Sequence, residues 1–282
     1  MLWVDLSRNL DINQINDRNF LLFSAAAAII TKRKNWELSL GSMFTSRAPS
    51  IEDLYSDGPH LGVYNYEIGL PELGAEHTYG LEGSLGFTVD RAELKITSYQ
   101  NYSPNYHLSK VMGEGYEPGA DWIEWGSGSA GWLYIYQMSG LEVYIHGYES
   151  EISYNLNDII SFDGSFSATR GENLTDNSSL YYMPPDRILL STEINLLPFS
   201  INLMHKKVFN QNRIGLYESA TPGYETYNVT GTYTMRNSWA IHKFILQIDN
   251  IFDRKYYNHL SRIKSIMPEK GRNVALQYRL NF

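Results

Sequence analysis

The chain ends in GRNVALQYRLNF, residues 271–282, and this stretch indicates the fold. Apolar and polar side chains alternate along it, and the apolar set is Val274, Leu276, Tyr278, Leu280 and Phe282. A period of two is typical of a β-strand with one apolar face and one polar face. Most soluble domains end in frayed, polar residues, so an orderly apolar end is unusual. We predict a final strand that reaches Phe282.

The same alternation recurs along the chain, for example in TYGLEGSLGFTVD, residues 78–90. We expect about eleven strands, the first near residues 20–31, and no convincing helix. The expected strands are about 10 to 14 residues long, whereas a typical globular strand has roughly 5 to 6 and a tilted membrane strand about 9 to 11. In one strand the apolar parity changes, from Val143 and Ile145 to Ile152 and Tyr154, and we expect a bulge near Gly147.

Two kinds of connection join the expected strands. Short turns fall at 31–35, 90–91, 155–158, 196–198 and 236–238, whereas long loops fall at 47–74, 106–131, 172–183, 210–222 and 253–270. Their alternation predicts an all-β, antiparallel, up-and-down meander. Outer-membrane barrels place short turns at one end and long loops at the other. A soluble barrel or sandwich with a buried apolar face has the same periodicity, but strand length and loop asymmetry favour the membrane barrel.

Composition narrows the function. The 282 residues are 43% hydrophobic and carry a formal net charge of −8. The hydrophobic content excludes global disorder, and the negative charge argues against a nucleic-acid partner. The chain has no cysteine, and G-x-S-x-G, H-E-x-x-H and phosphate-loop motifs are absent, so catalysis has no support. The longest apolar run, residues 20–30, is too short for a spanning helix. The first residues do not resemble a signal peptide, so in an exported protein Met1 would not be the true beginning.

Residues 44–85 resemble the motif loop of the TonB-dependent outer-membrane receptors. That family's loop has the form R-x-P-S-x-x-E-L-Y, then G-x-H, then E-x-G-x-P-x-L-x-x-E. The matching positions here are Arg47, Pro49, Ser50, Leu54, Tyr55, Gly58, His60, Glu67, Gly69, Pro71, Leu73 and Glu76, with Asp53 in the usual acidic position and Glu52 one place off it. Residues 139–156 are similar to the family's strand with a Gly-x-Glu, here Gly147-Tyr148-Glu149.

The C-terminal stretch 248–282 is similar to the family's closing strand pair. The matching positions are Asn250, Phe252, Asp253, Tyr256, Tyr257, Pro268, Gly271, Arg272 and Phe282. The resemblance implies that terminal Phe282 is the tag read by the outer-membrane assembly machinery. It also implies that the last strand pairs with the first strand of the complete barrel.

The resemblance spans about residues 20–282 and leaves part of a receptor unaccounted for. Family members have an N-terminal energy-coupling segment, a plug domain and about 22 strands. We therefore expect residues 20–282 to form the C-terminal half of a transmembrane β-barrel without its plug, and residues 1–19 to be a loop or the remnant of an upstream strand. Eleven alternating strands give the first and last the same direction, so we expect an open sheet rather than a closed barrel.

The resemblance implies a Gram-negative outer-membrane receptor for energy-coupled uptake of a scarce nutrient, namely a metal chelate (siderophore-bound iron, or zinc). The resemblance implies contact with outer-membrane lipid, and contact with the inner-membrane TonB complex through the missing N-terminal part. It implies no cofactor and no enzyme activity. The alternative is a soluble all-β carbohydrate-binding or hydrolytic domain.

Candidate ligand contacts lie in the long loops. Trp122 and Trp125 stand among carboxylates in the loop 106–131, where they could hold a cationic or metal-bearing ligand, although an ordinary acidic surface loop has the same composition. His60 and Glu67 could take part in a metal-bearing site, but a supporting hydrogen bond explains His60 equally well. Arg47 could meet an anionic ligand or pair with a carboxylate. His259, in another long loop, is the sixth candidate.

Overall fold

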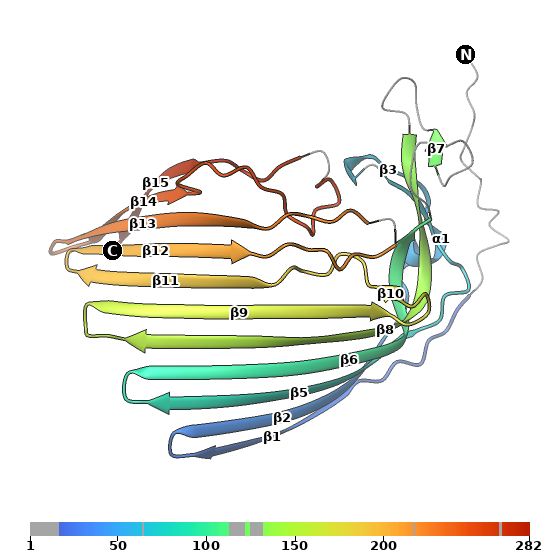
Figure 1. Ribbon diagram of the computed structural model, residues 1–282, viewed down its shortest axis with the longest axis horizontal. Coiled ribbons are helices and arrows are strands. Elements are labelled where there is room, and N and C mark those ends of the chain that lie inside the picture. The colour runs from blue at the N-terminus through green and yellow to red at the C-terminus, as the bar shows by residue number, and fades with distance from the viewer. Residues whose placement is uncertain (1–16, 64, 113–121, 125–131, 217, 265–266) are drawn as a thin grey trace.

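The computed structural model describes residues 17–63, 65–112, 122–124, 132–216, 218–264 and 267–282. Most of these residues belong to one curved sheet (Figure 1). Its main path has eleven strands, each antiparallel to its neighbours, in the order β1-β2-β5-β6-β8-β9-β11-β12-β13-β14-β15. The expected all-β class and number of barrel strands are confirmed.

These strands are long, as a tilted membrane strand requires. Their bounds are β1 (Ala25–Arg33), β2 (Trp36–Arg47), β5 (Glu76–Val89), β6 (Ala92–Val111), β8 (Trp132–Asn155), β9 (Ile160–Asn173), β11 (Arg187–Leu196), β12 (Phe199–Val208), β13 (Tyr224–Arg236), β14 (Ile241–Asp249) and β15 (Asn273–Asn281). The shorter elements are α1 (Ile51–Tyr55), β3 (Asp57–His60), η2 (Leu61–Val63), β4 (Asn65–Ile68), β7 (Trp122–Glu124) and β10 (Ser178–Ser179). No helix in the described ranges has the length and apolar character needed to cross a membrane.

The strand register divides the sheet into two faces. Leu38 lies opposite Leu85, Leu85 opposite Ile96, and the same correspondence continues from strand to strand as far as β15. Because side chains alternate along each strand, the apolar side chains stay on one face of the sheet and the polar side chains stay on the other. The apolar face includes Trp36, Leu38, Leu40, Phe44, Tyr79, Leu81, Leu85, Phe87, Leu94, Ile96, Ile152, Tyr154, Phe162, Phe166, Leu190, Ile201, Leu203, Val229, Tyr233, Phe244, Leu246, Val274, Leu276, Tyr278 and Leu280. The polar face includes Glu37, Ser39, Glu82, Ser84, Thr97, Glu149, Glu151, Asp163, Ser165, Glu193, Asn202, Thr230, Gln247, Gln277 and Arg279.

The apolar face is exposed rather than buried as a core. Leu81 is 61% exposed and Leu276 is 76% exposed. A soluble sandwich would cover this face with a second sheet, but the described strands form one sheet. The buried cluster of Leu141, Val143 and Leu180 lies instead near the long loops, where residues 174–186 fold back over β8. The exposed apolar face is therefore suited to contact with an apolar environment.

The change of apolar parity in β8 does not come from a bulge at Gly147, so that expectation is wrong. β8 pairs with β9 without a break, and the irregularity lies in β6, between Ser103 and Tyr106. Val143 points to the polar side of the sheet, where the folded loop buries it to 1% exposure. Ile152, farther along, lies on the apolar face. β8 keeps a regular alternation, but its apolar side chains near Val143 lie under the folded loop, whereas those near Ile152 lie on the exposed apolar face.

Two expected boundaries differ, and one helix was not expected. Strand β1 begins at Ala25, so residues 20–24 precede it rather than open it. Strand β6 continues to Val111, which shortens the expected loop 106–131, because Val111 packs against Tyr136 of β8. The chain also contains a short helix, α1, which begins at a capping box formed by Ser50 and Asp53.

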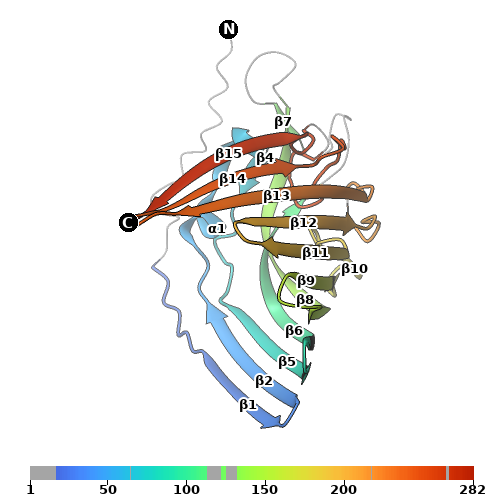
Figure 2. The same ribbon diagram turned by 90° about the vertical axis from the view of Figure 1, so that its left-hand side faces the viewer.

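The sheet is open, as expected. Figure 2 shows it as an arc, with α1 and β4 on the inner side. Within the described residues β1 and β15 share no pairing, and ten antiparallel steps between them give both strands the same direction. Figure 1 shows short turns at one end of the sheet and the longer connections at the other, which confirms the predicted asymmetry.

The motif loop between β2 and β5 folds inward and reaches β8. Its strand β4 pairs in parallel with Tyr134–Gln137, and Tyr66 of β4 is buried and donates a 2.8 Å hydrogen bond to Asp57. After β4 the chain turns at Gly69 and passes over α1. A Cβ at Gly69 would come within 2.5 Å of the backbone carbonyl carbon of Leu54, so this position has no room for a side chain.

We expect Gly69→Ala to loosen this loop, because the new methyl group overlaps backbone that cannot move away freely. Overpacking of this kind costs about 1–3 kcal/mol. In the intact receptor, limited proteolysis within residues 48–75 should become about tenfold faster, since cleavage follows the population of the opened loop. Gly58→Ala is the control, because a Cβ at Gly58 meets nothing within 4 Å. Equal cleavage rates for the two variants would contradict the assigned role of Gly69.

Candidate functional site

Arg47 and Glu76 close the base of the motif loop. Arg47 ends β2 and Glu76 begins β5, and the register places them opposite each other. Arg47 Nη2 donates to Glu76 Oε2 at 2.8 Å, and Nη1 lies 3.9 Å from Asp53. The same Glu76 oxygen accepts the backbone N–H of His107 at 2.9 Å. Arg47 thus pairs with carboxylates, which is one of the two roles considered for it.

Five side chains from distant parts of the chain gather where the loops meet, and we call them the mouth cluster: His60, Glu67, Tyr136, Tyr182 and Arg262. Glu67 Oε1 lies 3.3 Å from His60 Nδ1 and 3.4 Å from Arg262 Nη1. The Arg262 guanidinium lies over both rings, 5.6 Å from the centre of Tyr136 and 5.9 Å from that of Tyr182. The His60, Glu67 and Arg262 side chains are 59%, 30% and 36% exposed, so solutes can reach them.

A second, buried cluster lies beneath Arg262 and joins two long loops. Glu218 Oε1 lies 3.0 Å from Lys264 Nζ and 2.9 Å from His259 Nε2, although the histidine contact is poorly aligned for a hydrogen bond. Thr221 Oγ1 lies 2.8 Å from His259 Nδ1. Glu218 also accepts the backbone N–H of Gly215 at 3.0 Å. These contacts hold Gly215, Glu218 and Thr221 of one loop against His259 and Lys264 of the other.

Burial and charge act in opposite directions on this cluster. Burial would raise the pKa of the Glu218 carboxyl, but contacts with His259, the Gly215 N–H and Lys264 outweigh it, so the pKa lies below its ordinary value. The carboxylate therefore stabilises the packed loops at neutral pH, and this contribution is lost as the pH falls through the folded pKa. Burial lowers the pKa of the Lys264 ammonium, which the attraction of Glu218 only partly offsets.

The structure brings together two of the six candidate ligand residues. His60 and Glu67 meet in the mouth cluster, whereas Arg47 lies at the loop base with its carboxylate partners. His259 is 2% exposed and serves the buried cluster. Trp122 begins β7, which pairs with β8, and Trp125 lies outside the described residues together with Glu114, Glu117 and Asp121. No group of three or more potential metal ligands occurs in the described ranges.

Sequence reasoning did not identify Arg262, Tyr136 or Tyr182 as members of this site. Arg262 follows Glu67 by 195 residues in the chain, and no local motif surrounds it. Tyr136 lies on a strand with ordinary alternation, and Tyr182 lies in a loop without a recognised pattern. The parallel pairing of β4 with β8 places Glu67 opposite Tyr136, and the curvature of the sheet brings Arg262 near them.

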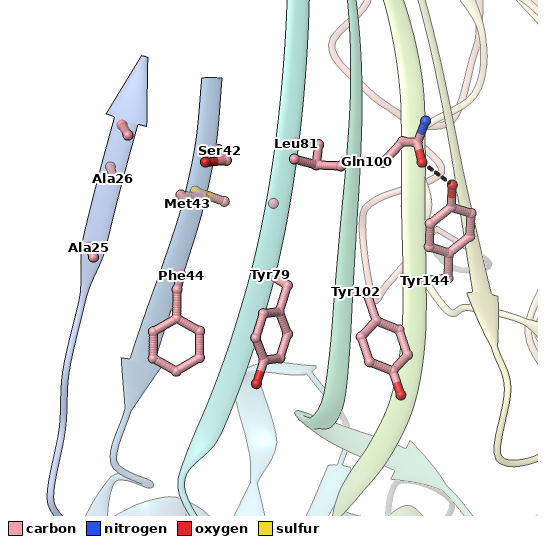
Figure 3. Close-up of a pocket in the computed structure, with 12 residues that line it drawn as sticks. Ala25, Ala26, Ser42, Met43, Phe44, Tyr79, Leu81, Gln100, Tyr102 and Tyr144 are labelled. Carbon is pink, nitrogen blue, oxygen red and sulfur yellow. Dashed lines mark hydrogen bonds between the residues drawn. The ribbon is translucent and has the colours of Figure 1, made fainter. Parts of the chain in front are cut away.

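Aromatic side chains form a row near each end of the apolar face. Figure 3 shows Phe44, Tyr79 and Tyr102 side by side near the long loops, where Phe44 and Tyr79 are 5.0 Å apart between ring centres. They line a hollow of about 580 Å³ on the apolar face, away from the mouth cluster. The row near the short turns contains Trp36, Phe87, Phe199, Tyr233, Phe244 and Tyr278. On β2 and β5, eight residues separate the rows, or about 27 Å along the strand.

Comparison with known proteins agrees with this architecture. A model of the TonB-dependent receptor-like β-barrel family matches residues 11–251, which is well over half of the chain. Among solved structures, the copper transporter OprC has a TM-score of 0.71 at 20% identity over 89% of this chain and 37% of its own.

Two further solved structures have TM-scores of 0.64. The FrpB iron transporter from Neisseria meningitidis is 14% identical over 90% of this chain and 38% of its own. The ferric enterobactin receptor PfeA from Pseudomonas aeruginosa is 17% identical over 89% of this chain and 39% of its own. The chain thus spans less than two fifths of each neighbour, and at these identities the likeness concerns the fold. With the family match, the two-faced sheet and the inward motif loop in agreement, the chain belongs to the TonB-dependent receptor β-barrel family.

Proposed function

We propose that this chain is the C-terminal part of the barrel of a Gram-negative outer-membrane receptor that imports a scarce nutrient. The observation that carries the proposal is the exposed apolar face bounded by two aromatic rows. Along strands tilted by about 40°, their separation of about 27 Å corresponds to a height of roughly 20 Å, close to the apolar band, about 25 Å tall, of outer-membrane barrels. The apolar face would meet lipid, and the polar face would line the lumen.

We propose a metal chelate, carrying siderophore-bound iron or zinc, as the ligand class. Support comes from neighbours named as a copper transporter, an iron transporter and a ferric enterobactin receptor. The mouth cluster offers both a cation and a carboxylate to such a ligand. The expected loops at 47–74 and 106–131, the second of which contains Trp122 and Trp125, remain our candidates for its contacts.

The proposed partners follow from the family and from the two ends of the sheet. The inner-membrane TonB complex would act through a plug and coupling segment supplied by the rest of the receptor. The assembly machinery would recognise Phe282, which is 92% exposed and stacks at 5.9 Å on Trp239. We propose no enzyme activity, because the family consists of receptors and transporters.

We expect Leu246→Arg to destabilise the intact receptor in lipid vesicles by about 2–4 kcal/mol, the cost of a cation near the middle of a lipid-facing band. Leu246 lies on the apolar face, level with Gly231 and between the aromatic rows. Gln247→Arg, on the polar face of the same strand, is the control and should change little. The free energy of unfolding, measured by guanidinium titration with tryptophan fluorescence, decides between the faces. A larger loss for Gln247→Arg would reverse the assignment.

Deleting Phe282 from the full-length receptor should lower its level in the outer membrane more than Asn281→Ala does. The deletion removes both the aromatic terminus and its contact with Trp239, whereas Asn281 carries only a polar side chain. Heat-modifiable receptor in purified outer membranes, quantified on gels, provides the measurement. Equal levels for both variants would remove Phe282 from the proposed assembly role.

Replacing Trp122 and Trp125 together by Ala should weaken ligand binding at least tenfold, since aromatic contacts of this kind are commonly worth more than 1 kcal/mol. The barrel should assemble normally. The matched control is Trp239→Ala, at the opposite end of the sheet. Ferric enterobactin and Cu(II) serve as probes in fluorescence titrations with the purified receptor. If a probe binds and both variants keep the wild-type affinity, these tryptophans do not contact it.

A further inference from the structure

Two cations lie side by side on the polar face, near its loop end. Arg187 is the first residue of β11, and Lys206 lies on β12. Lys206 pairs with Leu189, so Arg187 is its diagonal neighbour two residues away, on the same face. Such neighbours are roughly 7–8 Å apart between Cα atoms, close enough for long side chains to act on one object.

Neither cation is neutralised by a close carboxylate. Among the described residues every salt bridge lies elsewhere, and Glu269, whose charge acts on Lys206, remains beyond ion-pair distance. Lys207, the next residue but on the opposite face, pairs with Glu225 at 3.0 Å. Arg187 and Lys206 therefore differ from Lys207, because only Lys207 has a carboxylate within ion-pair distance.

Both side chains are nevertheless held in place. Arg187 Nε donates to Ser167 Oγ at 2.9 Å, while its two Nη groups donate to none of the residues described. Lys206 Nζ lies 5.6 Å from the centre of the Tyr224 ring, whose plane stacks at 4.1 Å on Tyr256. A fixed guanidinium with a free fork suits an anion that has two oxygens, and a nearby ammonium adds a second contact.

We propose that Arg187 and Lys206 form a binding site for an oxyanion, a carboxylate, sulfonate or phosphate group, on the inner wall of the barrel. The site lies beside the folded loops, since Leu180 and Met183 cover Gly171 on the same strand and face as Ser167. Arg187 is exposed and Lys206 is half-buried beside Tyr224, so an anion can reach both cations. The inference rests on the proposed function and extends it, because it assigns negative charge to the imported ligand.

The test uses the full-length receptor in detergent and the water-soluble polyanion pyrene-1,3,6,8-tetrasulfonate, followed by fluorescence anisotropy. We expect saturable binding that citrate displaces and glycerol does not. Arg187→Gln and Lys206→Gln together should raise Kd at least tenfold. A higher salt concentration should also raise the Kd of the wild-type receptor, because salt screens the attraction between the cations and the probe. Lys207→Gln, which removes a neighbouring cation from the opposite face, should change Kd less than twofold.

Heat-modifiable migration of each variant shows whether its barrel is folded. Wild-type and double-variant receptors that bind the probe equally would overturn the proposal, and so would a folded wild type without saturable binding. The second result would mean that another segment of the receptor neutralises these cations. Either failure leaves the uptake function standing, because outer-membrane location and uptake of ferric enterobactin or Cu(II) are measured separately. Absence of the receptor from the outer membrane would instead contradict the proposed function.

Discussion

The antiparallel pairing register is the constraint on which the rest of the structure depends. A strand presents alternate side chains to opposite sides, and each neighbouring strand must keep its own alternation in step. The register does this through all eleven strands of the main path, so that Leu38 and Leu276 lie on one face although 238 positions of sequence numbering separate them. A slip of one residue in a ladder would bring polar or charged side chains onto the apolar face. The same rule leaves Arg187 and Lys206 together on the polar face.

At the loop end of the sheet the structure is stabilised by other interactions. There, apolar side chains such as Leu141 and Leu180 are buried against each other in the usual way, and charged groups are compensated in pairs. Glu218 and Lys264 are both largely buried, which costs solvation, and their short contact and backbone hydrogen bonds offset that cost. The described parts of the long loops are therefore packed and paired among themselves, and Arg262 at their surface remains accessible.

Sequence reasoning recovered the sheet better than the site. Periodicity of two and the alternation of short and long connections identified the strands, because both features are local. Periodicity led to a wrong prediction for β8. Its side chains alternate without a break, but Val143 is buried under a loop on the polar side whereas Ile152 lies on the apolar face. Periodicity also missed α1, whose five residues are too few to show a helical period. The resemblance marked the motif loop, and the structure shows Arg47 and Glu76 paired at its base. Tyr136 and Arg262 could not be assigned to the site, since the pairing of β4 with β8 and the curvature of the sheet, which bring them near Glu67, join segments far apart in the sequence.

The parallel pairing of β4 with β8 has a consequence for the order of folding. A β4 strand can pair there only after β5, β6 and β8 have formed the surface that it crosses, and the contact between Glu67 and Arg262 closes a span of 195 residues. Bringing such distant segments together carries a large loop-closure cost, so neighbouring hairpins form before them. The outer layer of loops is then the last part of this chain to become ordered. A defect in any strand would therefore be visible first in these loops, which would fail to pack even when most hairpins have formed.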